Sequence, residues 1–156
     1  MLQLEIPGME PLELRHLLLD YNGTVAFDGI VIEGVMERLE RLSERLQVHV
    51  LTADTYGTVT QQCGGGFITV HVIGKARQDE AKRDYLQRLG AAHTFAAGNG
   101  RNDALMLSEA ALGAALLQGE GASVKSVVAA DLLFGSVNDM LDALLHPDRL
   151  VATLRN

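Results

Sequence analysis

The chain has 156 residues, a length that suits one globular domain, and we predict a single domain over residues 1–156. Its formal net charge of −7, without a basic cluster in the sequence, argues against a nucleic-acid partner. The sequence has one cysteine, no signal-like N-terminus and no run of about 20 apolar residues, so we predict a cytoplasmic protein with no membrane partner.

Short apolar runs rich in Val and Leu alternate with segments of helical period, which predicts an α/β fold with a mostly parallel sheet. The opening residues 1–14 contain two prolines and a glycine, and they are interpreted as an edge hairpin or an arm. Strands are predicted at residues 15–21, 47–53, 67–74, 93–98 and 112–117, with the run 126–131 as a candidate sixth strand.

Helices are predicted between and after these strands, at residues 34–46 and 78–90, from 101 onward and at 137–145. In the first of them Val35, Leu39, Leu42 and Leu46 fall on one face. The second is expected to end at Gly90, because glycine suits a helix C-cap, and the fourth is expected to stop at Pro147. Residues 64–66, three glycines, are interpreted as a loop between a helix and a strand.

Polar residues close four of the predicted strands. They are Asp20 and Asn22, then Thr52 and Asp54, then Lys75, and finally the run 99–103. An aspartate at a strand end is more often a turn former or a helix cap. Ligands of an open parallel sheet, however, collect at the carboxyl ends of its strands, so four such endings in one sheet favour a shared ligand site.

Phosphoryl transfer through a covalent aspartyl phosphate is the chemistry that would use this set. Asp20 is held at a rigid strand end, from which its carboxylate could attack phosphorus. Gly23 allows the chain to turn so that backbone N–H groups face an anion. Thr52 could supply a hydroxyl to a phosphate oxygen, and Asp20 with Asp103 meets the minimum that Mg²⁺ requires in carboxylate ligands.

A lysine is needed to balance the charge of the phosphoryl group. Lys82 falls on the inward stripe of its predicted helix together with Tyr85, Leu86 and Leu89, which is an unusual position for a lysine. The alternative is that Lys82 lays its stem along the core and puts its ammonium in water. Lys75, after the third strand, is the competing candidate.

The ordered set DYNGT, LTADT, Lys82 and GNGRNDALML resembles the four motifs of the haloacid dehalogenase (HAD) superfamily. More narrowly, it resembles the capless, soluble, P-type-ATPase-like phosphatase branch, from about Arg15 to the C-terminal ATLR. The resemblance implies a HAD-like hydrolase domain without a cap, a Rossmann-like three-layer sandwich with strand order 5-4-1-2-3, and a small flap from Val25 to Ile32. Capless relatives often assemble into oligomers or else act on large substrates. We predict a small phosphorylated substrate and a homo-oligomer, dimer or tetramer.

The resemblance also assigns roles to residues. Asp20 would be the nucleophile and a metal ligand, and Asn22, Thr52 and Lys82 would belong to the catalytic set. Thr52, Ala53, Gly23 and Lys82 would bind the substrate phosphate. The magnesium ion would be held by Asp20, the backbone carbonyl of Asn22, Asn99 and Asp103.

Two departures from the family pattern bear on activity. Asn22 stands where most of these phosphatases carry an aspartate that moves protons, and general acid and base catalysis is worth about 10²- to 10⁴-fold. Asn99 replaces the carboxylate of the usual GDGxND pattern, so magnesium should bind more weakly. P-type ATPases also lack an acid at the position of Asn22, which fits a longer-lived aspartyl phosphate.

The sequence therefore predicts a Mg²⁺-dependent phosphohydrolase that is slow or restricted to good leaving groups. The alternative is a catalytically impaired phosphate-binding or regulatory protein on the same scaffold. A phospho-accepting receiver domain is a third reading, but no acidic pair closes the first strand and no aspartate closes the third.

Overall fold

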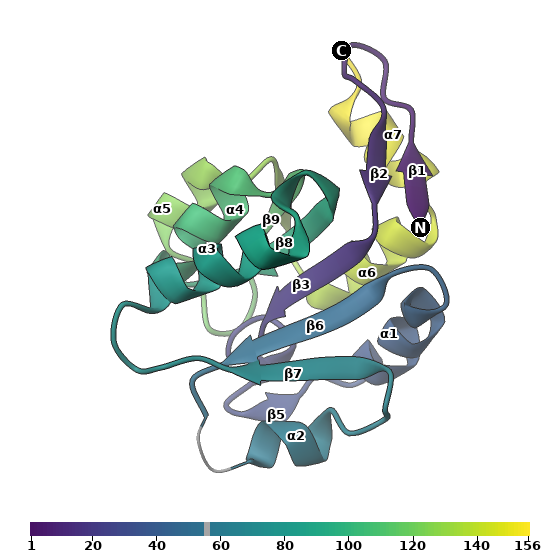
Figure 1. Ribbon diagram of the computed structural model, residues 1–156. Helices are drawn as coiled ribbons and strands as arrows, with labels where there is room; N and C mark the ends of the chain where they lie inside the picture. The colour runs from purple at the N-terminus through teal and green to yellow at the C-terminus, as the bar shows by residue number, and fades with distance from the viewer. Residues whose placement is uncertain (55–56) are drawn as a thin grey trace.

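The computed structural model describes residues 1–54 and 57–156, and a parallel sheet of six strands forms its centre (Figure 1). In sheet order the strands are β10 (Leu132–Phe134), β9 (Leu112–Leu116), β8 (Thr94–Gly98), β3 (His16–Asp20), β6 (Gln47–Thr52) and β7 (Ile68–Val72). All five neighbouring pairs are parallel. Counted along the chain, the order is 6-5-4-1-2-3, which confirms the predicted order and adds β10 at one edge.

The central strand β3 shows why these sequences form a parallel sheet. Leu17, Leu18 and Leu19 are all fully buried, as expected for a sheet that is covered on both faces. Successive side chains point to opposite faces. Leu17 and Leu19 therefore belong to one hydrophobic core, and Leu18 belongs to a second core on the other side.

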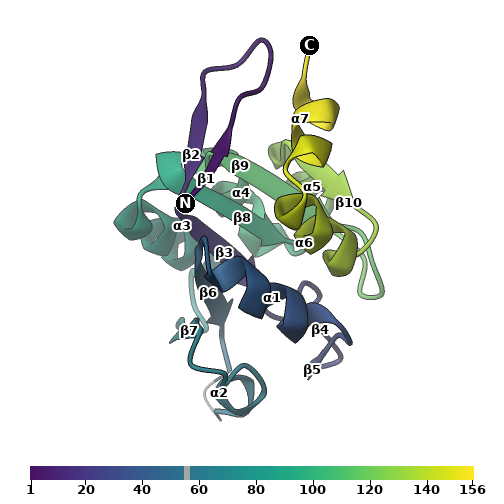
Figure 2. The ribbon, with the colours of Figure 1, turned by 90° about the vertical axis from the view of Figure 1, so that its right-hand side faces the viewer.

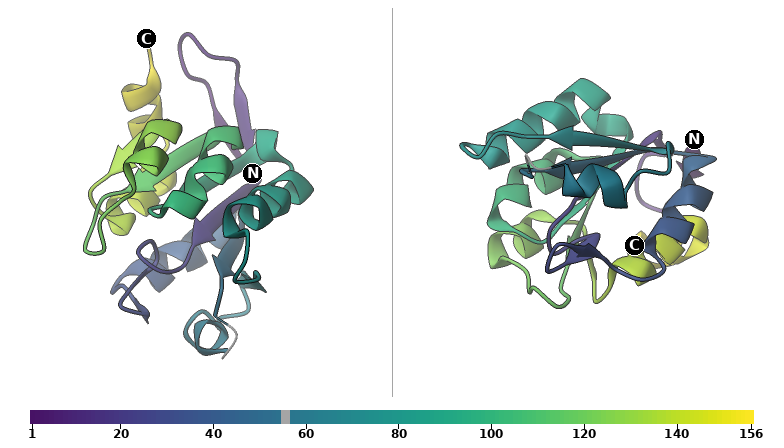
Figure 3. Two further views of the ribbon diagram at one scale, coloured as in Figure 1. Left: turned by 90° about the vertical axis from the view of Figure 1, so that its left-hand side faces the viewer. Right: turned by 90° about the horizontal axis from the view of Figure 1, so that it is seen from below.

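Helices cover both faces, so the predicted three-layer sandwich is confirmed (Figures 2 and 3). One face is covered by α1 (Val35–Ser43) and α6 (Val137–Leu145), and the other by α3 (Gln78–Leu89), α4 (Ala104–Glu109) and α5 (Val124–Ala129). The short helix α2 (Thr58–Gln62) lies between β6 and β7 in the chain. None of the described helices combines the length and apolar character that a bilayer crossing requires.

Two antiparallel hairpins lie outside the central sheet. The first, β1 (Leu2–Leu4) with β2 (Leu12–Leu14), confirms the predicted hairpin, but it forms a sheet of its own beside the C-terminal α7 (Asp148–Leu154), as Figures 1 and 2 show. The second, β4 (Ala26–Phe27) with β5 (Ile30–Val31), is the predicted flap. Its turn residues 28 and 29 both have positive φ, at 50° and 79°, which suits the right-handed twist of a two-residue hairpin.

The prediction of a strand at 126–131 is wrong. Most of that run lies in α5, and the sixth strand follows it as β10. A short apolar run without clear periodicity fits a helix segment as well as a buried strand, and here the helix forms. Pro147 follows the end of α6, as predicted, and it is also the N-cap of α7, where its φ of −57° already matches helical backbone.

Candidate active site

The carboxyl ends of the central strands surround a pocket of about 230 Å³. It is lined by Asp20, Asn22, Thr52, Ala53, Ile73, Gln78, Lys82, Asn99, Gly100 and Asn102. Six of the eight residues that the sequence nominated for the site are therefore brought together. The other two lie just behind the wall: Gly23 in the turn after β3, and Asp103 fully buried beneath the loop that follows β8.

The turn after β3 fixes the approach to Asp20. The carbonyl of Tyr21 accepts hydrogen bonds from the backbone N–H groups of residues 24, 25 and 26, which closes one tight turn. Gly23 has a φ of +79°, and a Cβ at this position would lie 2.3 Å from Nδ2 of Asn99. Only glycine fits here, because the backbone is left-handed and the Asn99 side chain occupies the space.

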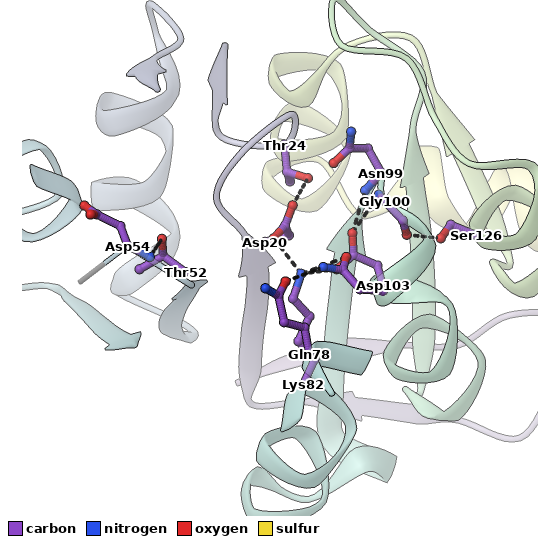
Figure 4. Close-up of polar contacts among 11 residues, drawn as sticks. Asp20, Thr24, Thr52, Asp54, Gln78, Lys82, Asn99, Gly100, Asp103 and Ser126 are labelled. Carbon is purple, nitrogen blue, oxygen red and sulfur yellow. Dashed lines mark hydrogen bonds and ion pairs between the residues drawn. The ribbon is translucent and has the colours of Figure 1, made fainter. Parts of the chain in front are cut away.

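Lys82 extends its buried side chain from α3 to the end of β3. Its Nζ lies 2.7 Å from Oδ1 of Asp20 and 2.6 Å from Oδ1 of Asp103 (Figure 4). Only 3% of the Lys82 side chain is exposed, so the interpretation in which its ammonium reaches water is wrong. Lys75 is exposed and does not line the pocket, so of the two candidate lysines the structure places Lys82 at the site.

Asp103 is held by groups that sequence reasoning did not identify. Its second carboxylate oxygen, Oδ2, accepts hydrogen bonds from the backbone N–H groups of Asn99 and Gly100, at 3.0 and 2.8 Å. A Cβ on Gly98, at the end of β8, would lie 2.3 Å from Cγ of Asp103. The first glycine of GNGRND therefore makes room for this carboxylate, and the glycine itself was the available signal.

Two further pocket residues were also missed. The Asn102 Oδ1 accepts a hydrogen bond from Lys82 Nζ at 3.3 Å, and the Asn102 Nδ2 donates to Oε1 of Gln78 at 2.7 Å. Gln78 precedes Lys82 by four residues on α3, and this helical spacing was the only sequence signal for its position. Asn102 therefore contacts the ammonium of Lys82 directly, and Gln78 holds the side chain of Asn102.

Thr52 is buried at the end of β6, and its Oγ1 accepts a hydrogen bond from the backbone N–H of Asp54 at 3.0 Å. The Asp54 carboxylate accepts from Thr58 Oγ1 and from the backbone N–H of Val59, at the start of α2. Asp54 is therefore placed as a turn and helix-start residue, as Figure 4 shows it beside Thr52 and away from Asp20. Thr55, the last residue of the LTADT motif, lies outside the described residues.

The three charges at the centre of the site do not balance. Burial, reinforced by the negative charge of Asp103, raises the pKa of Asp20 to about 7, although Lys82 acts in the opposite direction. Burial also opposes the charge on Lys82, but the two carboxylates outweigh it and raise the pKa of this ammonium. One cation thus faces two carboxylates, and the site has room for further positive charge.

The oxygen-rich donor set fits a hard divalent cation. Oδ2 of Asp20 accepts a long hydrogen bond, 3.5 Å, from Thr24, and Asn22 and Asn99, which carry amide oxygens, line the same pocket. Among the described residues, no three His, Cys, Asp or Glu side chains gather into a metal-binding group. A cation at this pocket would be held by Asp20, Asp103 and neutral oxygens.

Sequence comparison finds relatives without a named function. No protein-family model matches the chain. The uncharacterized protein MJ0073 of Methanocaldococcus jannaschii is 44% identical over 62 residues, which cover 40% of this chain and 67% of that protein. The uncharacterized protein MJ0072 of the same organism is 56% identical over 39 residues, which cover 25% of this chain and 89% of that protein.

Structural comparison identifies the fold. The cobalt-bound deoxy-D-mannose-octulosonate 8-phosphate phosphatase of Haemophilus influenzae superposes with a TM-score of 0.71 at 16% identity, over 86% of this chain and 88% of that one. The 3-deoxy-D-manno-octulosonate 8-phosphate phosphatase of Moraxella catarrhalis, in complex with magnesium, phosphate and KDO, superposes with a TM-score of 0.66 at 14% identity. This match covers 91% of this chain and 94% of that one. A phosphoserine phosphatase superposes with a TM-score of 0.63 at 14% identity, over 83% of this chain and 98% of that one.

A putative HAD family hydrolase of Streptomyces avermitilis also superposes, with a TM-score of 0.66 at 18% identity, over 96% of this chain and 90% of that one. The chain thus has the HAD-like α/β fold that its motifs predicted. Within that fold, it belongs to the same family as the two Methanocaldococcus proteins.

Proposed function

We propose that the chain is a phosphohydrolase that acts through an aspartyl phosphate on Asp20, with Mg²⁺ as its cation. The observation that carries the proposal is the buried ammonium of Lys82 within 2.7 Å of both Asp20 and Asp103, at the carboxyl edge of the sheet. The phosphatases among its structural neighbours support the same reaction class.

The proposed reaction has two displacements. A carboxylate oxygen of Asp20 forms a bond to phosphorus while the bond from phosphorus to the leaving-group oxygen breaks. Water then attacks the aspartyl phosphate, which releases phosphate and restores Asp20. Lys82 balances the charge of the phosphoryl oxygens, and the hydroxyl of Thr52 and the backbone at Gly23 and Ala53 bind them.

The proposed cation would be held by Asp20, the carbonyl of Asn22, Asn99 and Asp103, and when bound it would neutralise charge on the phosphoryl oxygens. Asn22 can neither donate a proton to the leaving group nor accept one from water. The leaving group must therefore depart unprotonated or take its proton from solvent, which favours substrates with good leaving groups. The same feature would prolong the life of the phosphoenzyme, as in a P-type ATPase.

The second candidate is a phosphate-binding or regulatory protein. It is favoured by Asn22 and Asn99, both of which remove a carboxylate from the pocket. Such a protein would bind phosphoesters without hydrolysing them, so the two candidates differ in turnover and not in binding.

The decisive assay measures release of p-nitrophenol from p-nitrophenyl phosphate, and hydrolysis of acetyl phosphate, during a Mg²⁺ titration. Asp20→Asn should lower turnover by about 100-fold or more, since it removes the attacking carboxylate. Asp84→Asn is a matched control, because Asp84 is exposed on α3 and paired with Arg83. Turnover that survives Asp20→Asn contradicts the proposal, and calorimetric phosphate binding without turnover by the wild type selects the second candidate.

A further inference from the structure

A second hollow adjoins the active-site pocket. It measures about 600 Å³ and is lined by Asp79, Gly100, Arg101, Asn102, Ala104, Leu105 and Lys125, which together are named the basic hollow here. Gly100 and Asn102 line both this hollow and the pocket of Asp20. The two spaces therefore share part of their lining.

Asn102 forms the ledge between the two spaces. Its side chain is held from both sides, by Lys82 Nζ at 3.3 Å and by Oε1 of Gln78 at 2.7 Å. The ledge is therefore fixed relative to the ammonium that faces Asp20. A group that projects over Asn102 from a phosphoryl group in the pocket would enter the basic hollow.

The charge of the basic hollow differs from that of the chain. The protein carries 20 acidic and 13 basic residues, yet the basic hollow has two cations, Arg101 and Lys125, and one acid, Asp79. Both cations are exposed, and neither forms an ion pair with any residue in the described ranges 1–54 and 57–156. By contrast Arg77, Arg83 and Arg38 are each paired with a carboxylate.

The spaces on the other side of the site lack this charge. A groove beside the flap is lined by Asp28 and Glu120 and by no Lys or Arg, and a hollow beside Tyr21 is lined by Asp54 and again by no Lys or Arg. An anionic part of a substrate would be repelled on those sides. Of these three spaces around the pocket, the basic hollow is the one in which a second anion meets unpaired positive charge.

We propose that Arg101 and Lys125 bind a second anionic group of the substrate, a carboxylate or a second phosphate, whose phosphoryl group lies beside Asp20. This inference rests on the proposed function and narrows its substrate class to small phosphorylated acids or bisphosphorylated molecules. The planar guanidinium of Arg101 suits either anion, because both present two oxygens to its paired N–H donors. Lys125 adds a point charge to the same space.

Binding of non-hydrolysable analogues tests the inference without depending on turnover. In calorimetry with saturating Mg²⁺, phosphonoacetate is compared with propylphosphonate, which has a similar size and lacks the carboxylate. The wild type should bind phosphonoacetate about 10-fold more tightly. Arg101→Gln and Lys125→Gln should each weaken phosphonoacetate binding by about 3- to 10-fold and leave propylphosphonate unchanged. Lys75→Gln, at an exposed lysine that lines neither space, is the matched control.

Replacing phosphonoacetate by 1,2-ethylenebisphosphonate distinguishes a carboxylate from a second phosphate as the preferred anion. The ligand whose affinity falls more in Arg101→Gln and Lys125→Gln carries the anion that the basic hollow prefers. Equal affinity of the wild type for phosphonoacetate and propylphosphonate overturns the inference. So does an equal loss of affinity for the two phosphonates in Arg101→Gln and Lys125→Gln. Neither result affects the proposed function, which is judged by p-nitrophenyl phosphate turnover in wild type and Asp20→Asn. If neither phosphonate binds, the inference is overturned as well, and the proposed function is still judged by p-nitrophenyl phosphate turnover.

Discussion

At the scale of single residues, Asn22 is the position where the pocket departs most from a proton-transferring site. Asn22 is exposed and lines both the pocket of Asp20 and the hollow beside Tyr21. A carboxyl group in its place would stand next to the nucleophile and open to water. It would thus be placed to protonate a leaving group and then to activate water, as general acid and base catalysis requires.

We therefore expect Asn22→Asp to raise turnover of alkyl phosphates by about 10- to 100-fold, because their leaving groups need a proton. Hydrolysis of p-nitrophenyl phosphate should change much less, since p-nitrophenolate departs without one. Steady-state kcat for the two substrate classes is the measurement. Asn156→Asp, at the exposed C-terminal residue and outside the pocket lining, is the control. A rate gain of equal size for both substrates would show that position 22 does not act through proton transfer.

Much of the pocket's membership could be predicted from single residues. Asp20 and Thr52 end apolar runs, and the helical stripe of α3 pointed Lys82 inward. The contacts of Asn102 and the second oxygen of Asp103 could not be predicted. They depend on the path of the backbone from residue 98 to residue 103, which is set by tertiary packing and not by local spacing.

At the scale of elements, the strands and helices with a strong period were predictable, and the short ones were not. β3, β6, β8, β9 and the helices α1, α3 and α6 lie where the sequence placed them. The prediction for the run at 126–131 failed because its four apolar residues, 127–130, carry too little periodicity to separate a helix from a strand. Its place in α5 depends on packing, since Ser126 is buried and α5 packs beside α4.

Polar side-chain contacts link the helix α3 to the sheet about one turn after Lys82. The hydroxyl of Tyr85 lies 3.0 Å from Nδ1 of His49 on β6, and Nε2 of His49 lies 3.3 Å from Nδ1 of His16 on β3. Burial, with a smaller effect of His16, lowers the pKa of His49 to about 4. The neutral form of His49 is therefore part of the folded structure.

This contact predicts a loss of stability in acid. His49 takes up a proton near pH 6.5 in the unfolded chain and near pH 4 in the folded one, so the free energy of unfolding falls as the pH drops through that interval. After allowance for solvent screening, the loss should be about 2 kcal/mol. Urea unfolding of wild type and His49→Asn at pH 7.5, 5 and 4 measures it.

The comparison with His49→Asn is necessary because Asp20 acts in the opposite direction. The raised pKa of Asp20 lets the folded chain hold a proton that the unfolded chain releases, so this group adds stability as the pH falls below about 7. Asp20 is present in both proteins, and its contribution cancels in their difference. Parallel stability curves for the two proteins would contradict a buried neutral His49.

At the scale of the whole molecule, the flap formed by β4 and β5, between β3 and α1 in the chain, exposes apolar side chains to solvent. Ile30 is 70% exposed and Phe27 is 47% exposed. Both line a groove of about 640 Å³ together with Ala26, Val31 and Ile32. We propose that a second copy of the chain covers this groove, because burial of apolar area is worth about 25 cal/mol per Å².

Sedimentation velocity at micromolar concentration should therefore detect a dimer or tetramer of the wild type. Ile30→Lys places a charge on the most exposed of these apolar side chains and should shift the population to monomer, because an unpaired ammonium would have to be desolvated in the interface. Leu133→Lys is the matched control, since Leu133 is similarly exposed but lies on the edge strand β10. A shift in Leu133→Lys alone would move the interface to that edge, and a monomeric wild type would exclude self-association as the cover of the flap.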